Sequence, residues 1–186
     1  YRYKINCKMG SIFTILSNWA YGSEEAYILI LGLDASGKTT ILNRLKCGEN
    51  KQTIPTIGFN CEHIKFGRLS FVGWDIGGQD NIRKMWHNYF ENADAVVFVV
   101  DSNDKRRFDL VRSELEHLVN HRMLRECPFL IFANKQDLPQ AITGNDLCDK
   151  LNLHMLMGRT NWKMVNSTAT QGKGIDDGFR WLANIV

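Results

Sequence analysis

The segment GLDASGKTT, residues 32–40, has the residue types and the spacing of a phosphate-binding loop. It lies between an apolar run and a helical pattern, and the N-terminus of a helix attracts anions. Its glycines let the backbone curl so that N–H groups face a phosphate. Lys38 can reach β- and γ-phosphates, and the Thr39 hydroxyl can hold Mg²⁺. We therefore predict nucleotide contacts along this loop from Gly32, Asp34, Ala35, Ser36, Gly37, Lys38, Thr39 and Thr40.

The segment NKQD, residues 134–137, follows another apolar run and indicates recognition of guanine. The Asp137 carboxylate can accept hydrogen bonds from the ring N1–H and the exocyclic amine of guanine, a donor pair that adenine lacks. The stem of Lys135 can lie across the plane of the base. Thr168 and Ala169 follow the last apolar run, where the Ala169 N–H would lie near guanine O6. We predict base contacts from Asn134, Lys135, Asp137, Thr168 and Ala169.

A third segment, WDIGGQD (residues 74–80), supplies groups for phosphoryl transfer to water. Asp75 is suited to hold Mg²⁺ through a water molecule, and the Gly78 N–H can meet a γ-phosphate. Gln79 can orient the attacking water. Thr56 offers a second hydroxyl for Mg²⁺. The candidate catalytic residues are Gln79, Lys38 and Gly78, and the candidate metal ligands are Thr39, Thr56 and Asp75.

Six short apolar runs must position these segments. The runs cover residues 27–31, 58–66, 69–75, 95–100, 129–133 and 163–166. The runs AVVFVV and FLIFA lack polar alternation, as expected for strands buried on both faces of a parallel sheet. Gly67-Arg68 between the second and third runs predicts a hairpin, so one edge strand should be antiparallel.

Amphipathic patterns separate the later runs. Apolar residues recur at helical spacing at Phe108, Val111, Leu115 and Leu118, and again at Ile175, Phe179, Leu182 and Ile185. Strands that alternate with helices predict a three-layer α/β domain, whose ligands bind beyond the carboxyl ends of the strands.

The composition is that of one ordinary globular domain. The chain has 186 residues, of which 44% are hydrophobic and 23% charged, with a net charge of +3. The basic run at 105–107 reads as a solvated helix start, so we expect no nucleic-acid partner. Five scattered cysteines without a C-x-x-C pair favour reduced thiols. Cys61 and His63 alternate along a predicted strand surface, which argues against a metal site there.

Taken together, these motifs strongly resemble the ADP-ribosylation factor (Arf) family of small GTPases from about residue 9 onward. The resemblance rests on GLDASGKTT, IPTIGFN, WDIGGQD, IRKMWHNYF, VVDSNDKRR and FANKQDLP. It implies a P-loop GTPase domain at 25–186 with a six-stranded, mostly parallel sheet, one antiparallel edge strand and helices on both faces. An amphipathic switch helix and linker would occupy 9–24, and 1–8 would be an extension outside the family pattern.

The resemblance also implies a function. Such a protein binds GTP with Mg²⁺, hydrolyses GTP to GDP and recruits effectors to membranes in vesicle-mediated transport, cycling between cytoplasm and Golgi or other endomembranes. Its partners would be an exchange factor, an activating protein, and coat, tether or lipid-enzyme effectors. Residues 52–55 contain no arginine that could act in cis, so we expect slow intrinsic hydrolysis and an arginine supplied by the activating protein.

Other functions stay open at this point. Within the family, an Arf-like GTPase in Golgi tethering, ciliary or cytoskeletal traffic is the alternative, and Lys84-Met85 replaces an expected Pro-Leu in the second switch. Ser36, Gly73 and Thr168 are further departures from the family pattern. A nucleotide-locked module without hydrolysis is disfavoured by Gln79. A P-loop kinase or ATPase is disfavoured by the NKQD segment.

The segment KMGSIFTILSNW, residues 8–19, has the pattern of an N-myristoylation signal, M-G-x-x-x-[ST]. If the native chain starts at Met9, we expect a myristoyl group on Gly10. One such chain binds membranes only marginally, so a second signal is needed. The apolar side of a helix headed by Ile12 and Phe13 would supply it. The resemblance implies that this helix is packed with GDP and membrane-bound with GTP, coupled to a register shift of the hairpin at 58–75.

Overall fold

A computed structural model describes residues 26–47, 59–67, 69–158 and 160–186 of the chain. The predictions made for Gly10, for Thr56 and for a helix within 9–24 lie outside these residues. Among the described residues, no helix is long and apolar enough to cross a membrane.

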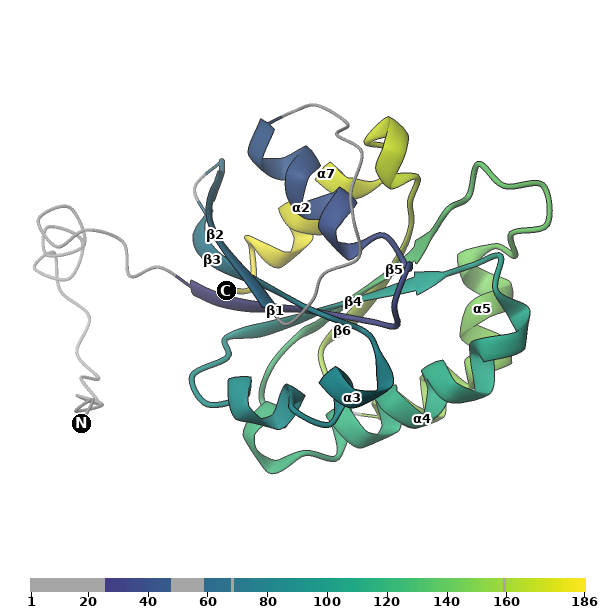
Figure 1. The fold of residues 1–186 in the computed structure, drawn as a ribbon, viewed down its shortest axis with the longest axis horizontal. Helices are drawn as coiled ribbons and strands as arrows, with labels where there is room; N and C mark the ends of the chain where they lie inside the picture. The colour runs from purple at the N-terminus through teal and green to yellow at the C-terminus, as the bar shows by residue number, and fades with distance from the viewer. Residues whose placement is uncertain (1–25, 48–58, 68, 159) are drawn as a thin grey trace, which may run out of the picture.

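The core of the fold is one six-stranded sheet in the order β2-β3-β1-β4-β5-β6. Its strands are β1 (Ala26–Leu31), β2 (Phe59–Phe66), β3 (Leu69–Ile76), β4 (Ala95–Asp101), β5 (Phe129–Asn134) and β6 (Trp162–Asn166). All six predicted strands are confirmed, and the observed ends differ from the predicted ends by one residue at most. Figure 1 shows the twisted sheet running through the middle of the molecule.

The direction of pairing also confirms the prediction. β2 pairs with β3 in antiparallel register, with Phe66 opposite Leu69, whereas β1, β4, β5 and β6 pair in parallel. Every residue of β5 is buried, and β4 is buried up to its last residue, Asp101. The unbroken apolar runs of these two strands are explained by helices on both faces of the sheet.

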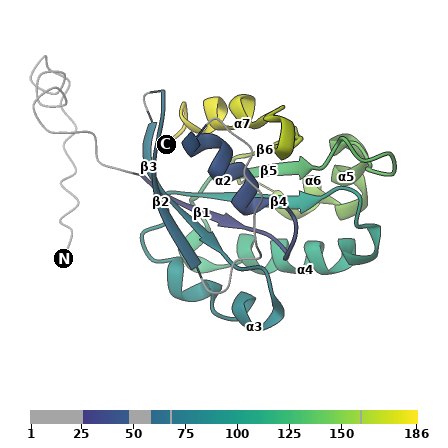
Figure 2. The ribbon, with the colours of Figure 1, turned by 45° about the horizontal axis from the view of Figure 1, so that its top comes forward.

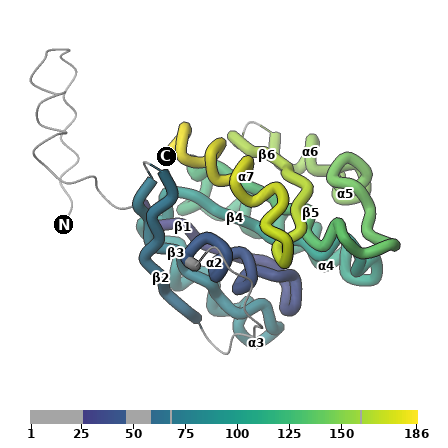
Figure 3. The backbone as a smooth tube through the Cα atoms, turned by 90° about the horizontal axis from the view of Figure 1, so that it is seen from above, coloured from purple at the N-terminus to yellow at the C-terminus, as the bar shows by residue number. Residues whose placement is uncertain are grey.

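The two faces carry different helices. α2 (Lys38–Cys47) and α7 (Ile175–Leu182) lie on one face, the near face in Figures 2 and 3. The opposite face carries α3 (Asp80–Arg83), α4 (Phe108–Val119), α5 (Gly144–Leu151) and α6 (Leu153–Met157). Short 3₁₀ turns complete the chain at η1 (Trp86–Tyr89), η2 (Lys105–Arg107), η3 (Arg122–Leu124) and η4 (Ala169–Gln171).

The two predicted amphipathic helices are present as α4 and α7, and one of their predicted contacts is wrong. Phe108, Val111, Leu115 and Leu118 of α4 are all buried. In α7, Ile175, Phe179 and Leu182 are buried, but the helix ends at Leu182 and Ile185 is 39% exposed. The apolar periodicity therefore continues for one turn beyond the residues that the sheet can cover.

Candidate functional site

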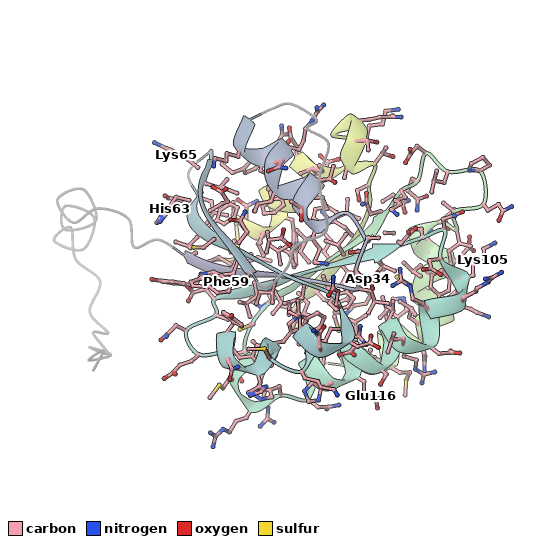
Figure 4. All side chains as sticks on the ribbon, in the orientation of Figure 1. Asp34, Phe59, His63, Lys65, Lys105 and Glu116 are labelled. Atoms are coloured by element: carbon pink, nitrogen blue, oxygen red, sulfur yellow. The ribbon has the colours of Figure 1, made fainter. Side chains whose placement is uncertain are left out.

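The loops that follow β1, β3, β4, β5 and β6 are joined to one another by side-chain contacts at the carboxyl edge of the sheet. Figure 4 labels Asp34, which marks the loop after β1 (residues 32–37, here called the P-loop). This convergence is the geometry expected for ligand sites in open α/β sheets.

The backbone of the P-loop curls as its sequence predicts. Positive φ angles occur at Gly32 (141°), Ala35 (58°) and Gly37 (103°). A Cβ atom at Gly32 would lie 2.3 Å from the Val99 carbonyl oxygen, and one at Gly37 would lie 2.3 Å from Asn134 Nδ2. Glycine is thus required at both motif positions by backbone conformation and by space. Left-handed residues of this kind let successive backbone N–H groups form a concave site that binds anions.

Lys38 begins α2 and folds its side chain back over the P-loop. Its Nζ donates to the carbonyl oxygens of Gly32 at 3.0 Å and Leu33 at 2.8 Å, and the residue is only 6% exposed. Burial lowers the pKa of Lys38 to about 8, although the carboxylates of Asp75 and Asp34 oppose the shift. The ammonium is therefore a poorly solvated cation at the loop, which an incoming phosphate would stabilise.

Thr39 and Asp75 form the candidate metal pair. The Thr39 hydroxyl donates to Asp75 Oδ2 at 2.5 Å, and Asp75 is fully buried at the end of β3. A hydroxyl that donates its proton in this way keeps oxygen lone pairs for a cation. No cluster of three or more His, Cys, Asp or Glu side chains within the described ranges could hold a metal by itself. The pair suits Mg²⁺, which is usually held by few protein oxygens together with substrate phosphates and water.

The loop after β3 lies directly on the P-loop. A Cβ at Gly78 would lie 2.2 Å from the Leu33 carbonyl carbon and 2.3 Å from the Asp34 nitrogen. Only glycine permits this approach, and it puts Gly78 close enough to contact a phosphate bound on the P-loop. Gln79 follows at the start of α3, half-buried.

Two side chains anchor this loop from below. Arg83 NH1 donates to the Gly78 carbonyl at 2.9 Å, while its Nε pairs with Glu114 of α4 at 2.8 Å. The indole N–H of Trp86 donates to the Gly77 carbonyl at 3.1 Å. The backbone that precedes Gln79 is therefore fixed to the helical layer beneath it.

Asn134 joins the P-loop to the loop after β6. Its Nδ2 donates to the Ser36 carbonyl at 2.8 Å. Its Oδ1 accepts from the Ser167 hydroxyl at 3.2 Å and from the Ala169 N–H at 3.0 Å. The side chain is buried, so water cannot satisfy its polar atoms and these hydrogen bonds do so instead. We call this arrangement the Asn134 junction.

The remaining base-contact candidates are brought to the same edge. Lys135 has a left-handed backbone (φ 64°), and its Nζ pairs with Asp101 at 2.6 Å. Asp137 is exposed. The Thr168 N–H bonds to the Lys173 carbonyl, and the Ala169 N–H bonds to Asn134. Their roles in guanine recognition stay predictions.

Three side chains that hold the site together were not predicted from the sequence. For one of them, Arg107, the interpretation of the run 105–107 as a solvated helix start is wrong, because its guanidinium pairs with Asp34 and Asp104. Asp101 fixes Lys135, Arg83 fixes Gly78, and Arg107 pairs with Asp34 at 2.7 Å. Asp101 and Arg107 lie in VVDSNDKRR, a segment that follows a buried strand, so their position beyond a carboxyl end was an available signal. No local pattern revealed their partners.

Comparison with known proteins adds two findings. The model of the "ADP-ribosylation factor family" matches residues 11–186. The solved structure of the Arl6 BBS3 small GTPase from Trypanosoma brucei, with the bound nucleotide analogue GppNp, is similar at 38% identity and a TM-score of 0.82. The match covers 87% of this chain and 96% of that chain.

Proposed function

Since the chain belongs to the ADP-ribosylation factor family of small GTPases and is a GTP hydrolase, we propose that it works as an Arf-like switch whose GTP-bound form recruits effectors. The similarity to a solved Arl6 protein supports the Arf-like assignment over a role in coat recruitment at the Golgi. The observation that carries the mechanism is the contact of Gly78 with the P-loop backbone, because it brings the loop of Gln79 to the phosphate site.

The P-loop and Lys38 bind the phosphates in this mechanism. Thr39 and Asp75 would hold Mg²⁺, with Thr56 as the further ligand expected from the sequence. The metal would supply positive charge to offset the charge that develops on the phosphate oxygens. The Gly78 N–H meets the γ-phosphate, and loss of that phosphate on hydrolysis releases the loop.

Gln79 orients the attacking water, and a partner supplies the arginine. Arg83 contacts the loop that carries Gly78 and Gln79, but its guanidinium is engaged by Asp80, Glu114 and the Gly78 carbonyl. It is therefore a support of the loop rather than a free cation for the γ-phosphate. An arginine supplied in trans is worth about 10³–10⁵ in rate.

A single-turnover assay tests the catalytic proposal. Purified protein alone should hydrolyse GTP very slowly, and an activating protein should accelerate it. Gln79→Leu should bind GTP normally and stay in the GTP form with the activating protein present. Rapid hydrolysis by that variant would contradict the role of Gln79. Competition of bound fluorescent GDP by GTP but not by ATP tests the guanine assignment separately.

An aromatic cluster supports effector recruitment through the hairpin. Phe59 of β2, Trp74 of β3 and Tyr89 of η1 lie with ring centroids 5.5–5.7 Å apart. Phe59 is 52% exposed, and together with the partly buried Trp74 and Tyr89 it gives the surface a contiguous apolar group. The cluster spans the hairpin and the segment after Gln79, so movement of either would change the surface. A pull-down with the Gln79→Leu protein, compared with the GDP-bound protein, identifies the effectors.

Reversible membrane binding is the remaining part of the proposal. Myristoylation at Gly10 and an amphipathic helix within 9–24 are expected from the sequence and the family. Mass spectrometry of the natural N-terminus tests the lipid. Co-sedimentation with anionic vesicles should capture more GTP-bound than GDP-bound protein, and equal capture would argue against a nucleotide-controlled helix.

A further inference from the structure

Arg107, in the 3₁₀ turn after β4, reaches across to the P-loop. Its NH1 pairs with Asp34 Oδ1 at 2.7 Å, and its NH2 donates to the Asp34 carbonyl oxygen at 3.1 Å. Its Nε pairs with Asp104 Oδ2 at 2.5 Å. One guanidinium therefore fixes both the side chain and the main chain of Asp34, and its planar fork of donors does so in a single geometry that a flexible ammonium does not impose.

The contact to the Asp34 carbonyl determines which way the next N–H points. In a trans peptide the carbonyl oxygen of one residue and the N–H of the next point in opposite directions. With the Asp34 carbonyl held toward Arg107, the Ala35 N–H is directed away from it. Ala35 also has a φ of 58°, a left-handed conformation that costs a residue with a Cβ roughly 1–2 kcal/mol. A conformation of this kind persists only where the surroundings hold it.

We propose that Arg107 is a positioning residue of the nucleotide site, which aims the Ala35 N–H at the phosphates of the bound nucleotide by holding the Asp34 peptide. This inference rests on the proposed function, because it takes a guanine nucleotide as the ligand of the P-loop. It assigns to η2 a part in phosphate binding that neither the P-loop motif nor the guanine motif contains.

The same contact answers an electrostatic problem of the site. Asp34 places a carboxylate in a loop that has to bind an anion, and like charges at short range repel. The positive charge of Arg107 pairs with that carboxylate and with Asp104. Both Asp34 and Arg107 act on the charge state of Lys38, so the pair lies within electrostatic range of the phosphate-binding cation.

The chain offers a matched control on the same turn. Arg106 and Arg107 are neighbours in η2, but Arg106 is exposed and makes no ion pair with another described residue. Dissociation of a fluorescent GDP analogue from full-length protein is measured for wild type, Arg107→Ala, Arg107→Lys and Arg106→Ala. We expect dissociation about tenfold faster for Arg107→Ala, which corresponds to about 1.4 kcal/mol. Arg107→Lys should lie between that variant and wild type, and Arg106→Ala should match wild type.

The ³¹P NMR spectrum of bound GDP separates positioning from a general loss of stability. A changed amide position should move the β-phosphate resonance of the Arg107→Ala complex and leave the Arg106→Ala complex unchanged. A wild-type dissociation rate with an unmoved β-phosphate resonance would overturn the inference. If Arg107→Ala does not fold, Arg107→Lys decides by the same two measurements. Failure of the wild-type protein to bind GDP would instead overturn the proposed function.

Discussion

The ammonium of Lys38 is buried against the two carbonyl oxygens that it contacts, and that burial gives the site a pH dependence. Because its pKa is lowered to about 8, the side chain of the nucleotide-free protein is charged below that pH and becomes neutral above it. A bound phosphate favours the charged form, so it should raise the pKa again. GDP affinity should therefore fall as the pH rises through about 8.

The measurement is calorimetry of GDP binding at pH 7 and at about pH 9 in buffers of different ionisation enthalpy. At the higher pH, binding should take up protons, and at pH 7 the uptake by Lys38 should be much smaller. Lys38→Arg, whose guanidinium stays charged, should lose the uptake. The same proton uptake in that variant would show that another group titrates.

A second prediction about a single residue concerns Gly78. A methyl group added there meets the P-loop backbone, which cannot move aside as the end of a flexible side chain can. Gly78→Ala should lower the free energy of unfolding by about 1–3 kcal/mol, the usual cost of overpacking. Urea unfolding measures it. The control is Gly67→Asn, since a Cβ at Gly67 meets no described atom within 4 Å and Asn tolerates positive φ.

At the scale of elements, β3 and α2 pack unusually closely at Gly73. A Cβ there would lie 2.9 Å from Leu42 Cδ1 of α2 and 3.3 Å from a ring carbon of Phe71. This contact explains the glycine that departs from the family pattern in the middle of a strand. The neighbour is the end of a flexible side chain, so a small shift can accommodate one methyl group but not a branched side chain.

Two substitutions separate these cases. Gly73→Ala should be close to neutral, because the shift of Leu42 is offset by roughly 0.5–1 kcal/mol from removing a strand glycine. Gly73→Val should lower the free energy of unfolding by about 1–3 kcal/mol. Urea unfolding of both variants tests this, and an equally stable Gly73→Val would mean that α2 moves freely over β3.

Elements were predictable from the sequence wherever one local pattern decided them. The buried strands β4 and β5, the hairpin and the P-loop depend on neighbouring residues, and the structure agrees with each. The helices α5 and α6, of eight and five residues, were not predicted, although Leu147, Cys148 and Leu151 of α5 are apolar at helical spacing. Ile185 was wrong because periodicity does not indicate where the sheet beneath a helix ends.

The residues of the candidate site also differ in whether they could be predicted from a local sequence pattern. Motif residues could be named from local spacing, but their supports could not. Arg107 and Asp34 are 73 residues apart, and Arg83 and Glu114 are 31 apart. Such pairs arise only when the strand order brings two loops together, and a single sequence does not encode that juxtaposition as a pattern.

At the scale of the whole molecule, the P-loop follows β1, an inner strand, while β2 and β6 form the two edges of the sheet. The Asn134 junction crosses this arrangement from β5 to the loops after β1 and β6. Asn134→Ala would leave the Ser36 carbonyl, the Ser167 hydroxyl and the Ala169 N–H without these hydrogen bonds. Unsatisfied buried groups cost about 1–3 kcal/mol each.

We therefore expect Asn134→Ala to lower the free energy of unfolding by at least about 2 kcal/mol. Urea unfolding measures the loss in the nucleotide-free protein. Asn120→Ala is the control, because Asn120 is exposed and, among the described residues, its side chain bonds only to the Glu116 carbonyl of its own helix end. Equal losses in the two variants would refute the junction as a stabilising feature.

The Asn134 junction has a thermodynamic consequence for the ligand. One amide orders both the loop that would hold the phosphates and the loop that would face the base. Occupying either end should then reduce the conformational freedom that the other end has to lose on binding. The two halves of the nucleotide would bind cooperatively, and by linkage each would raise the affinity of the other by the same factor. In Asn134→Ala that factor should approach one, so guanosine and pyrophosphate would bind independently of each other.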